Sequence, residues 1–199
     1  LRSKAIEFYL GDYDRCFSAY SNDESIRKKA ASGGMTTQLI IYMLHNNIID
    51  GALLSRLKIK NGEFLPQSFI ATTEEEVKSC QSSIYIDFSL KISREIENFN
   101  GRLAVVALPC QLNILSKSKK RNELIKIGLF CGHTSKKELI ENVLKEKVDL
   151  KQIEEFCFRA GHWRGQSCLK LKSGEIINFP YFDFGMFQNI FFQMPQKCL

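Results

Sequence analysis

Two cysteines are the side chains with the clearest chemical potential in this chain. Cys110 lies in Leu108-Pro109-Cys110-Gln111 and Cys131 in Phe130-Cys131-Gly132-His133, each at the end of an apolar run of strand length. Ligand sites in open α/β sheets lie beyond the carboxyl ends of strands, so both thiols could line one cleft. The alternative is that each cysteine is a small buried apolar residue.

Cys131 and His133 also suggest a cysteine nucleophile with its base, or a zinc site. A catalytic pair is normally brought together by tertiary structure, and a structural zinc ion needs four clustered ligands. Only these two residues are close in sequence. We therefore disfavour both a hydrolase and a zinc protein.

A stretch of small and polar residues around Ser32-Gly33-Gly34 is the candidate anion-binding site. An amphipathic run follows it, which predicts a helix over about 34–45 with Ser32 as its N-cap. The glycines would let a ligand approach the backbone, and the helix start offers N–H groups to a phosphate. The alternative is a capped core helix after a tight turn. The candidate phosphate-binding residues are Ser32, Gly33, Gly34, Thr36 and Thr37.

Two arginines flank a glycine-containing turn near the end of the chain. Arg159 and Arg164 surround the only tryptophan, Trp163. A guanidinium can bind a phosphate through two parallel hydrogen bonds or stack on a flat ring. The alternative is a turn fixed by a buried tryptophan.

Composition narrows the class of protein. The chain has 199 residues, 44% of them hydrophobic, which suits one domain or one domain with a small appendage. Seven widely spaced cysteines without a complete C-x-x-C favour a reducing cytoplasm over a disulfide framework. The net charge is +6, but the basic patch at 117–121 lacks interleaved aromatics, so we expect no nucleic-acid partner. No apolar run reaches transmembrane length.

The elements that would position these residues alternate between strands and helices. Asp23 is expected to cap a helix ending near Lys29, and Asn61-Gly62 to join two strands. Thr73 and Ser135 open possible capping boxes. Strands are expected at 17–20, 48–57, 63–70, 103–108 and 125–131, the last two as buried neighbours, with a helix at 88–99 and a hairpin over 168–179. The predicted fold is α/β, with a mixed or mainly parallel sheet flanked by helices and a small β-hairpin extension.

Several short motifs follow one another along nearly the whole chain. They are Arg27 to Thr37 with its Ser-Gly-Gly, Ile48-Ile49-Asp50-Gly51-Ala52, Ser83-Ile84-Tyr85, Ala107 to Gln111, Ile127 to Cys131, Phe158 to Gly165, and Phe192 to Leu199. Taken together and in this order, they resemble one known family, the beta subunits of coenzyme F-420 (deazaflavin) hydrogenase and dehydrogenase, which are iron–sulfur flavoproteins.

The resemblance implies an oxidoreductase subunit that passes electrons between a 4Fe-4S cluster, FAD and a deazaflavin or other acceptor. It implies a flavin-binding α/β domain over 1–150, and over 151–199 a hairpin and aromatic tail that lead into an iron–sulfur region. A redox partner subunit or ferredoxin-like donor is expected. By analogy, Tyr85, Pro109, Cys110 and Gln111 would line the flavin pocket, Arg159 and Arg164 would support an anionic group, and Cys131 and Cys198 would ligate the cluster.

The chain departs from the family pattern at three places. Ile84 replaces a usual lysine, Ala107 replaces a common glycine, and the sequence stops one residue after Cys198, which suggests C-terminal truncation. Two further interpretations therefore stay open: a non-catalytic electron-transfer or assembly module, and a relative without cofactors. We also expect the aromatic tail over 181–192 to favour self-association.

Overall fold

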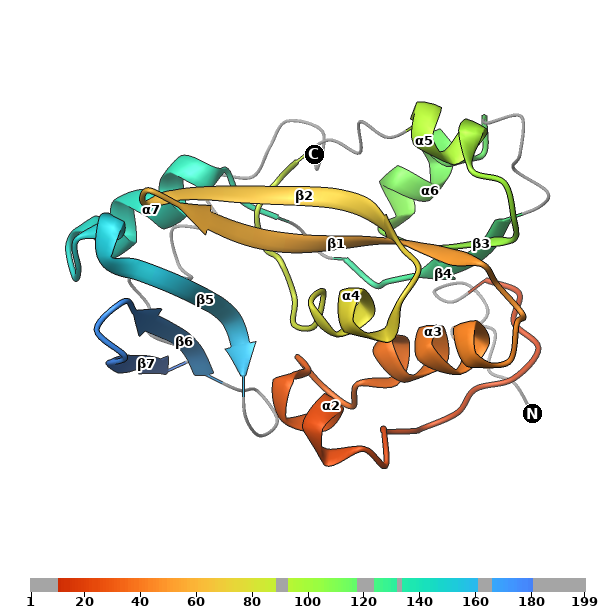
Figure 1. The fold of residues 1–199 in the computed structure, drawn as a ribbon, viewed down its shortest axis with the longest axis horizontal. Coiled ribbons are helices and arrows are strands. Elements are labelled where there is room, and N and C mark those ends of the chain that lie inside the picture. The colour runs from red at the N-terminus through yellow and green to blue at the C-terminus, as the bar shows by residue number, and fades with distance from the viewer. Residues whose placement is uncertain (1–10, 89–92, 118–123, 132–133, 161–165, 181–199) are drawn as a thin grey trace.

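The computed structural model describes residues 11–88, 93–117, 124–131, 134–160 and 166–180 (Figure 1). The described helices are α2 (Glu24–Lys29), α3 (Met35–His45), α4 (Glu74–Lys78), α5 (Ser93–Asn98), α6 (Pro109–Leu115), α7 (Lys137–Lys145) and the short 3-10 helix η1 (Leu150–Gln152). The strands are β1 (Gly51–Lys60), β2 (Glu63–Ala71), β3 (Leu103–Ala107), β4 (Leu124–Gly128), β5 (Ile153–Ala160), β6 (Gln166–Leu171) and β7 (Ile176–Pro180). None of the described helices has the length and apolar character needed to cross a bilayer.

The first sheet is mixed and has the strand order β2-β1-β3-β4. β1 and β2 are antiparallel and joined at Asn61-Gly62, where both residues have a positive φ, the conformation that two-residue hairpin turns require. β3 is parallel to both β1 and β4. The predicted mixed sheet is therefore confirmed.

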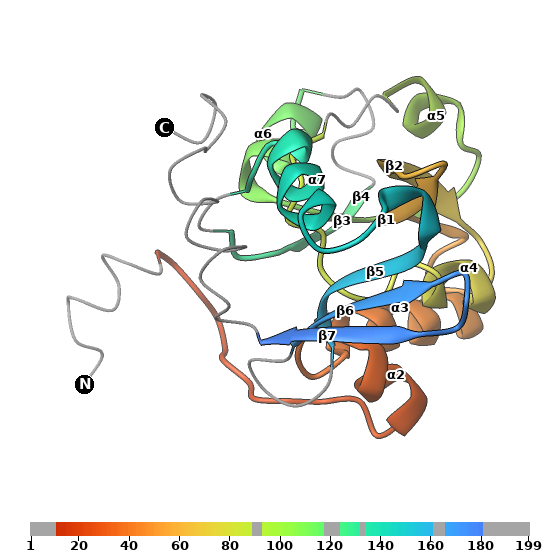
Figure 2. The ribbon, with the colours of Figure 1, turned by 90° about the vertical axis from the view of Figure 1, so that its left-hand side faces the viewer.

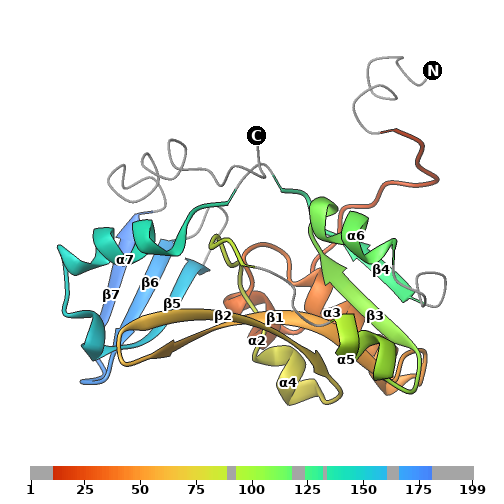
Figure 3. The same ribbon diagram turned by 90° about the horizontal axis from the view of Figure 1, so that it is seen from above.

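Helices cover both faces of this sheet. Successive residues of a strand point to opposite faces. Accordingly, Ala52 and Leu54 of β1 join the apolar cluster that includes residues of α2, α3 and α4. Leu53, between them, joins the cluster that includes residues of α5 and α6. Figure 3 shows the long β1–β2 ribbon running along the molecule, with β3, β4, α5 and α6 at one end.

The second sheet is antiparallel, with the order β5-β6-β7. It packs with α7 and with Phe64 of β2 around one buried cluster, which includes Phe156 and Phe158 of β5. Figure 2 shows the three strands of this sheet below α7. The predicted hairpin is confirmed as β6 and β7. The apolar pattern does not predict β5, because Glu154-Glu155 interrupts the alternation of apolar residues along it.

The prediction that β4 is a buried strand is wrong. β4 is the parallel neighbour of β3, as expected, but it ends the sheet order among the described strands and is mostly exposed. Lys126 and Gly128 interrupt the apolar run, and Ile125 is 38% exposed. The apolar side chains of the run alone did not distinguish an edge strand from a central one.

Local predictions had mixed outcomes. Asp23 caps α2, and Thr73 forms the expected capping box with Glu76. Ser135 does not cap α7, whose N-cap is Lys136, because the Ser135 hydroxyl donates to the Tyr85 carbonyl instead. Residues 17–20 form no strand. Within the described part of 88–99, the helix covers only α5, and β1 begins at Gly51 rather than at residue 48.

Candidate functional site

The turn after β3 is built by its three predicted site residues. Pro109 is the first residue of α6, where a missing N–H is tolerated. The Gln111 side chain accepts a hydrogen bond from the Leu108 N–H at 2.9 Å, which fixes the turn between strand and helix. Cys110 is exposed. Proline and glutamine thus shape a turn that presents the cysteine to solvent.

The turn after β4 lies beside it. The Leu129 N–H donates to the Ala107 carbonyl at 3.0 Å, so the parallel pairing continues to the point where both strands end. Phe130 is 99% exposed, and Cys131 is also exposed. The structure therefore places Cys110 and Cys131 in adjacent turns at one edge of the sheet, and both differ from the buried apolar residue of the alternative interpretation.

The segment around Tyr85 connects this edge to Arg159. Ser135, four residues beyond Cys131, donates from its hydroxyl to the Tyr85 carbonyl at 2.7 Å. The Tyr85 ring meets Phe158 edge to face, with centroids 5.5 Å apart. The Ser82 hydroxyl donates to the Arg159 carbonyl at 3.0 Å. Three segments far apart in sequence are thus joined through residues 82–85.

Ser82 holds an unusual backbone conformation in this segment. Its φ is 79°, in the left-handed region that residues with a side chain rarely occupy. Such strain costs on the order of 1–3 kcal/mol and persists where the surroundings determine the conformation, often at functional sites. The hydrogen bond to the Arg159 carbonyl is a contact that fixes it.

The start of α3 differs from its prediction. The N-cap is Gly34, with φ 76°, and no side chain caps the helix; Ser32 is exposed and lies outside it. A Cβ on Gly33 would lie 2.9 Å from the Ala19 carbonyl oxygen, and one on Gly34 would lie 2.9 Å from Ile26 Cγ2. The glycines are therefore required by contacts within the chain, and the space beside them is not open to a ligand.

The groups of α3 that suit an anion lie one turn further on. Thr36 and Thr37 are half-buried in the first turn of the helix. No carbonyl among the described residues accepts a hydrogen bond from their N–H groups, whereas the Gln38 N–H donates to Gly34. The helix start therefore retains N–H groups that are not used within the described part of the chain, although its glycines serve another purpose. That these groups bind an anion stays a prediction.

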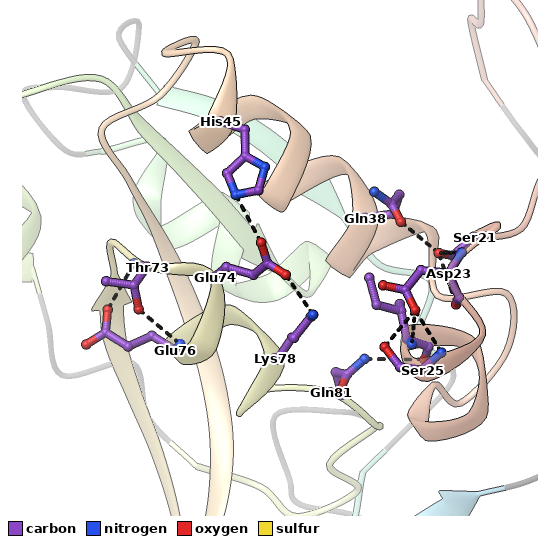
Figure 4. Close-up of polar contacts among 11 residues, drawn as sticks. Ser21, Asp23, Ser25, Gln38, His45, Thr73, Glu74, Glu76, Lys78 and Gln81 are labelled. Carbon is purple, nitrogen blue, oxygen red and sulfur yellow. Dashed lines mark hydrogen bonds and ion pairs between the residues drawn. The ribbon is translucent and has the colours of Figure 1, made fainter.

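Polar contacts fix α3 at both ends (Figure 4). Near its start, the buried Ser21 donates from its hydroxyl to Gln38 Oε1 at 2.7 Å. Near its end, His45 Nε2 lies 3.0 Å from Glu74, and Lys78 Nζ lies 2.6 Å from the same carboxylate. The hydrogen bond from Lys78 holds the pKa of Glu74 below its usual value, with a smaller contribution from His45. The His45–Glu74 contact ties α3 to α4, and the Ser21–Gln38 contact ties α3 to the segment before α2.

One further contact continues this network toward the Tyr85 segment. Gln81 Nε2 donates to the Ile26 carbonyl of α2 at 3.3 Å, and Ser82 follows directly. The position of α2 is thereby coupled to the strained residue that contacts Arg159. Burial raises the pKa of the neighbouring Cys80 to about 11, so this thiol is not a nucleophile at neutral pH.

Two shallow hollows lie away from the predicted site. One, of about 620 Å³, opens between the β1–β2 turn and α7 and includes Glu63, Lys137 and Glu141. The other, of about 540 Å³, opens between the end of α3 and the start of α4 and includes His45 and Glu74. Neither is lined by a predicted site residue.

One residue of interest was not predicted. Thr134 is buried, and its hydroxyl has no hydrogen-bond partner among the described residues. It follows β4 by six residues and precedes Ser135, which binds the Tyr85 carbonyl. An unsatisfied buried hydroxyl is a group that a ligand can satisfy. The only signal in the sequence is its place just beyond the strand end.

The described residues fit a flat ring system better than a metal cluster. Pro109, Cys110, Phe130 and Cys131 present apolar and thiol groups at one edge. In the part of the chain that is described, no three His, Cys, Asp or Glu residues are grouped closely enough to hold a metal ion. Arg164 and Cys198 lie outside the described residues. The described residues alone therefore do not fit a 4Fe-4S cluster, which needs four ligands.

Two family models match the chain. The model "Coenzyme F420 hydrogenase/dehydrogenase, beta subunit N-term" matches residues 16–92, and the corresponding C-terminus model matches residues 100–196. Together they cover nearly all of the elements described above.

Curated proteins give a concordant result. The coenzyme F420 hydrogenase subunit beta of Methanosarcina barkeri is 28% identical over 154 residues, which are 71% of this chain and 52% of that protein. The coenzyme F420-dependent sulfite reductase of Methanocaldococcus jannaschii is 26% identical over 171 residues, 75% of this chain and 26% of that protein. The chain spans about half the length of the hydrogenase beta subunits that it matches.

A solved structure has the same fold. A chain of the F420-reducing [NiFe] hydrogenase complex from Methanosarcina barkeri superposes with a TM-score of 0.71 at 22% identity. The match covers 96% of this chain and 66% of that one.

Proposed function

The chain belongs to the coenzyme F420 hydrogenase/dehydrogenase beta subunit family, and from this premise we propose that it is part of an electron-transferring oxidoreductase subunit. In this proposal it binds FAD and exchanges electrons with coenzyme F420, a deazaflavin, or with another small acceptor. A further subunit or a ferredoxin-like protein is its redox partner. The observation that carries the proposal is the meeting of two exposed cysteine turns at the carboxyl edge of parallel strands.

The proposed FAD site combines the start of α3 with the turn after β3, because both offer suitable groups. The N–H groups and hydroxyls of Thr36 and Thr37 bind the pyrophosphate at the positive end of α3, with Ser32 beside them. Pro109, Cys110 and Gln111 support the ring system. Tyr85 completes the pocket, and Arg159 and Arg164 balance anionic charge.

A bound flavin supplies the hydride and single-electron chemistry that amino-acid side chains lack. The protein residues hold and orient it. The Leu108–Gln111 hydrogen bond keeps the Pro109 turn rigid, and the contact between Leu129 and Ala107 keeps the two turns at a fixed separation. The buried Thr134 hydroxyl is available to a polar group of the ring.

For the 4Fe-4S cluster we propose only that the complete protein contains it. The resemblance implies Cys131 and Cys198 as ligands, and the described residues supply no complete ligand set. We assign no electron-transfer step through the cluster.

The two departures in the described part of the motifs do not weigh against FAD. Ala107 is buried with Leu53 and Val105 in the apolar cluster beside α5 and α6, so its methyl group fills core space. Ile84 is half-buried and packs against the cluster of the second sheet. Both side chains stabilise the scaffold, so these two departures are compatible with the proposed FAD site.

Flavin binding is tested with the double variant T36V/T37V, which removes two hydroxyls and keeps the side-chain shape. Hydrogen bonds to charged groups contribute about 1.5–3 kcal/mol, so FAD affinity should fall roughly tenfold or more. Fluorescence of FAD released from the purified chain measures occupancy. T72V is the matched control, because Thr72 lies beside α4. A wild-type chain that neither retains FAD nor binds added FAD contradicts the proposal.

Turnover separates an enzyme from a passive electron carrier. With a reduced viologen dye as donor, the flavin-loaded chain should bleach the absorbance of coenzyme F420. Flavin reduction by the dye without F420 reduction would support the non-catalytic interpretation instead.

A further inference from the structure

Two cysteines outside the proposed site lie directly opposite each other in the second sheet. Cys157 of β5 is the register partner of Cys168 of β6 in an antiparallel pair. Their sequence neighbours Phe156, Phe158 and Leu169 are buried in the shared core. Because side chains alternate along a strand, both thiols point to the opposite face of the sheet.

The pairing geometry brings the two cysteines near the spacing that a disulfide needs. Directly opposed residues in an antiparallel pair have Cβ atoms about 4.5–5.5 Å apart and Cα atoms about 4.5–5.5 Å apart. A disulfide needs Cα atoms about 4.4–6.8 Å apart and Cβ atoms about 3.5–4.5 Å apart. The Cα spacing already fits, and a small approach of the strands satisfies the Cβ requirement.

Local features allow that approach. The β5–β6 register is irregular on both sides of this pair, between Ile153 and Glu155 and between Cys157 and Ala160, so the ladder is not rigidly regular there. Both cysteines are half-buried, which leaves them accessible to small reagents and holds them against the sheet.

We propose that Cys157 and Cys168 form a reversible cross-strand dithiol, a modification site at which a small-molecule disulfide oxidises both residues to an intramolecular disulfide. One cysteine thiolate attacks a sulfur of the reagent, forming a mixed disulfide and releasing one thiol. The second cysteine thiolate attacks the mixed disulfide and releases the other thiol. Two electrons pass from the cysteine sulfurs to the reagent, and two thiol protons are balanced by the two thiols formed.

The surroundings of the pair make the reaction slow at neutral pH. Burial is the main cause that raises the pKa of both thiols, and Glu155 adds to it in each case. Cys168 further raises the pKa of Cys157, whereas Lys29 at the end of α2 lowers it. On β7, Asn178 is the register partner of Cys168 and carries no charge. Oxidation should therefore accelerate as pH rises, because only the thiolate attacks.

The disulfide would lie close to Arg159, which belongs to the same strand, β5. Arg159 follows Cys157 by two residues, and its carbonyl accepts the Ser82 hydroxyl. Oxidation thus joins β6 covalently to the strand that carries this contact. The inference rests on strand register and does not depend on the proposed cofactors.

The test incubates the purified chain with excess oxidised glutathione at about pH 8, near the pKa of an ordinary thiol. We expect a peptide map in which Cys157 is linked to Cys168, with a mass two hydrogen atoms below the sum of the two reduced peptides. The exposed Cys16 reports in the same sample that the reagent reacts, by forming a glutathione adduct. A reductant should restore both thiols.

Single variants and a second oxidant complete the test. C157S and C168S should each abolish the linked peptide, and C16S should leave it intact. Diamide, which takes up two hydrogens from a nearby dithiol, should give the same link. The proposal is overturned if Cys16 reacts while Cys157 and Cys168 remain reduced, or if either cysteine links only to another residue or another chain.

Discussion

At the residue scale, Gly34 shows how one position can satisfy a motif for an unexpected reason. Its φ of 76° and its contact with Ile26 make glycine necessary for the turn into α3. A bulky side chain at Gly33 or Gly34 would therefore disturb the fold itself. Variants of these glycines report on stability, and Thr36 and Thr37 are the better test of FAD binding.

We expect G34A to lower the free energy of unfolding by more than the cost of the left-handed conformation alone. That conformation costs an alanine about 1–2 kcal/mol, and overpacking against Ile26 adds roughly 1 kcal/mol or more. Gly174 provides the matched control, because its φ is 89° and nothing lies within 4 Å of an added Cβ. Denaturant titrations of both variants measure the difference. Equal losses for G34A and G174A would show that the Ile26 contact is unimportant.

Residue identity predicted some site features and not others. The strand–helix boundary at Pro109 is a local signal, and it located the turn that carries Cys110, but the exposure of Cys110 stayed open. Ser32 has the side chain of an N-cap, but the packing of Gly33 against residues 19–20 moves the helix start to Met35. Ser82 acquires its role from a distant partner, Arg159, and Thr134 from its burial in the fold, so no local pattern identified them.

At the element scale, a capping box stabilises the start of α4, and its acidic residue, Glu76, makes that stabilisation depend on pH. The Glu76 carboxylate accepts hydrogen bonds from the Thr72 and Thr73 N–H groups at 2.8 and 3.3 Å. The bond from Thr72 is the main cause that holds the pKa of Glu76 below the usual 4.5. A lowered folded-state pKa contributes stability above the unfolded pKa, and this contribution is lost as pH falls through the folded-state value.

We therefore expect E76Q to be less stable than the wild type at neutral pH and to lose less stability below about pH 4.5. Thermal unfolding followed across this pH range measures both effects. E75Q is the control, because the neighbouring Glu75 carboxylate accepts no hydrogen bond from the described residues. An acid dependence that is the same in E76Q and the wild type would rule out this contribution.

The strands show where prediction from apolar patterns stops. β3 is an unbroken apolar run and is buried between β1 and β4, as expected. β4 and β5 are harder to predict from apolar residues, because the burial of a strand depends on which elements cover it. β5 is stabilised by Phe156 and Phe158, which pack on residues from β2 and α7 that lie far away in sequence.

At the scale of the whole molecule, the fold class was predictable because the alternation of strands and helices is a strong signal. How the two sheets pack against each other was not predictable, since the apolar cluster that joins them combines residues of β2, α7 and β5–β7, which lie far apart in sequence. The division at residue 150, and the assignment of cofactors to each part, stay predictions. The division coincides with the start of η1.

The end of the molecule that carries β4 has an exposed apolar surface. Phe130 and Ile114 are 99% and 69% exposed, and Leu129 and Ile125 are also partly exposed. Figure 3 shows β4 and α6 at this end of the ribbon. Among the described strands, β4 also has one side without a partner strand. Contiguous apolar surface and an open strand edge both favour association with another chain.

We expect the purified chain to self-associate through this surface as its concentration rises. Removing Phe130 from the contact should weaken association roughly tenfold or more, because burying a phenylalanine contributes about 1.5–3 kcal/mol. Sedimentation velocity across a concentration series compares the wild type with F130S. Phe17 is 83% exposed in the segment before α2, so F17S removes another highly exposed ring from a different part of the chain and should leave association unchanged. A chain that stays monomeric at high concentration, or that responds equally to both substitutions, would show that the β4 end is not the contact.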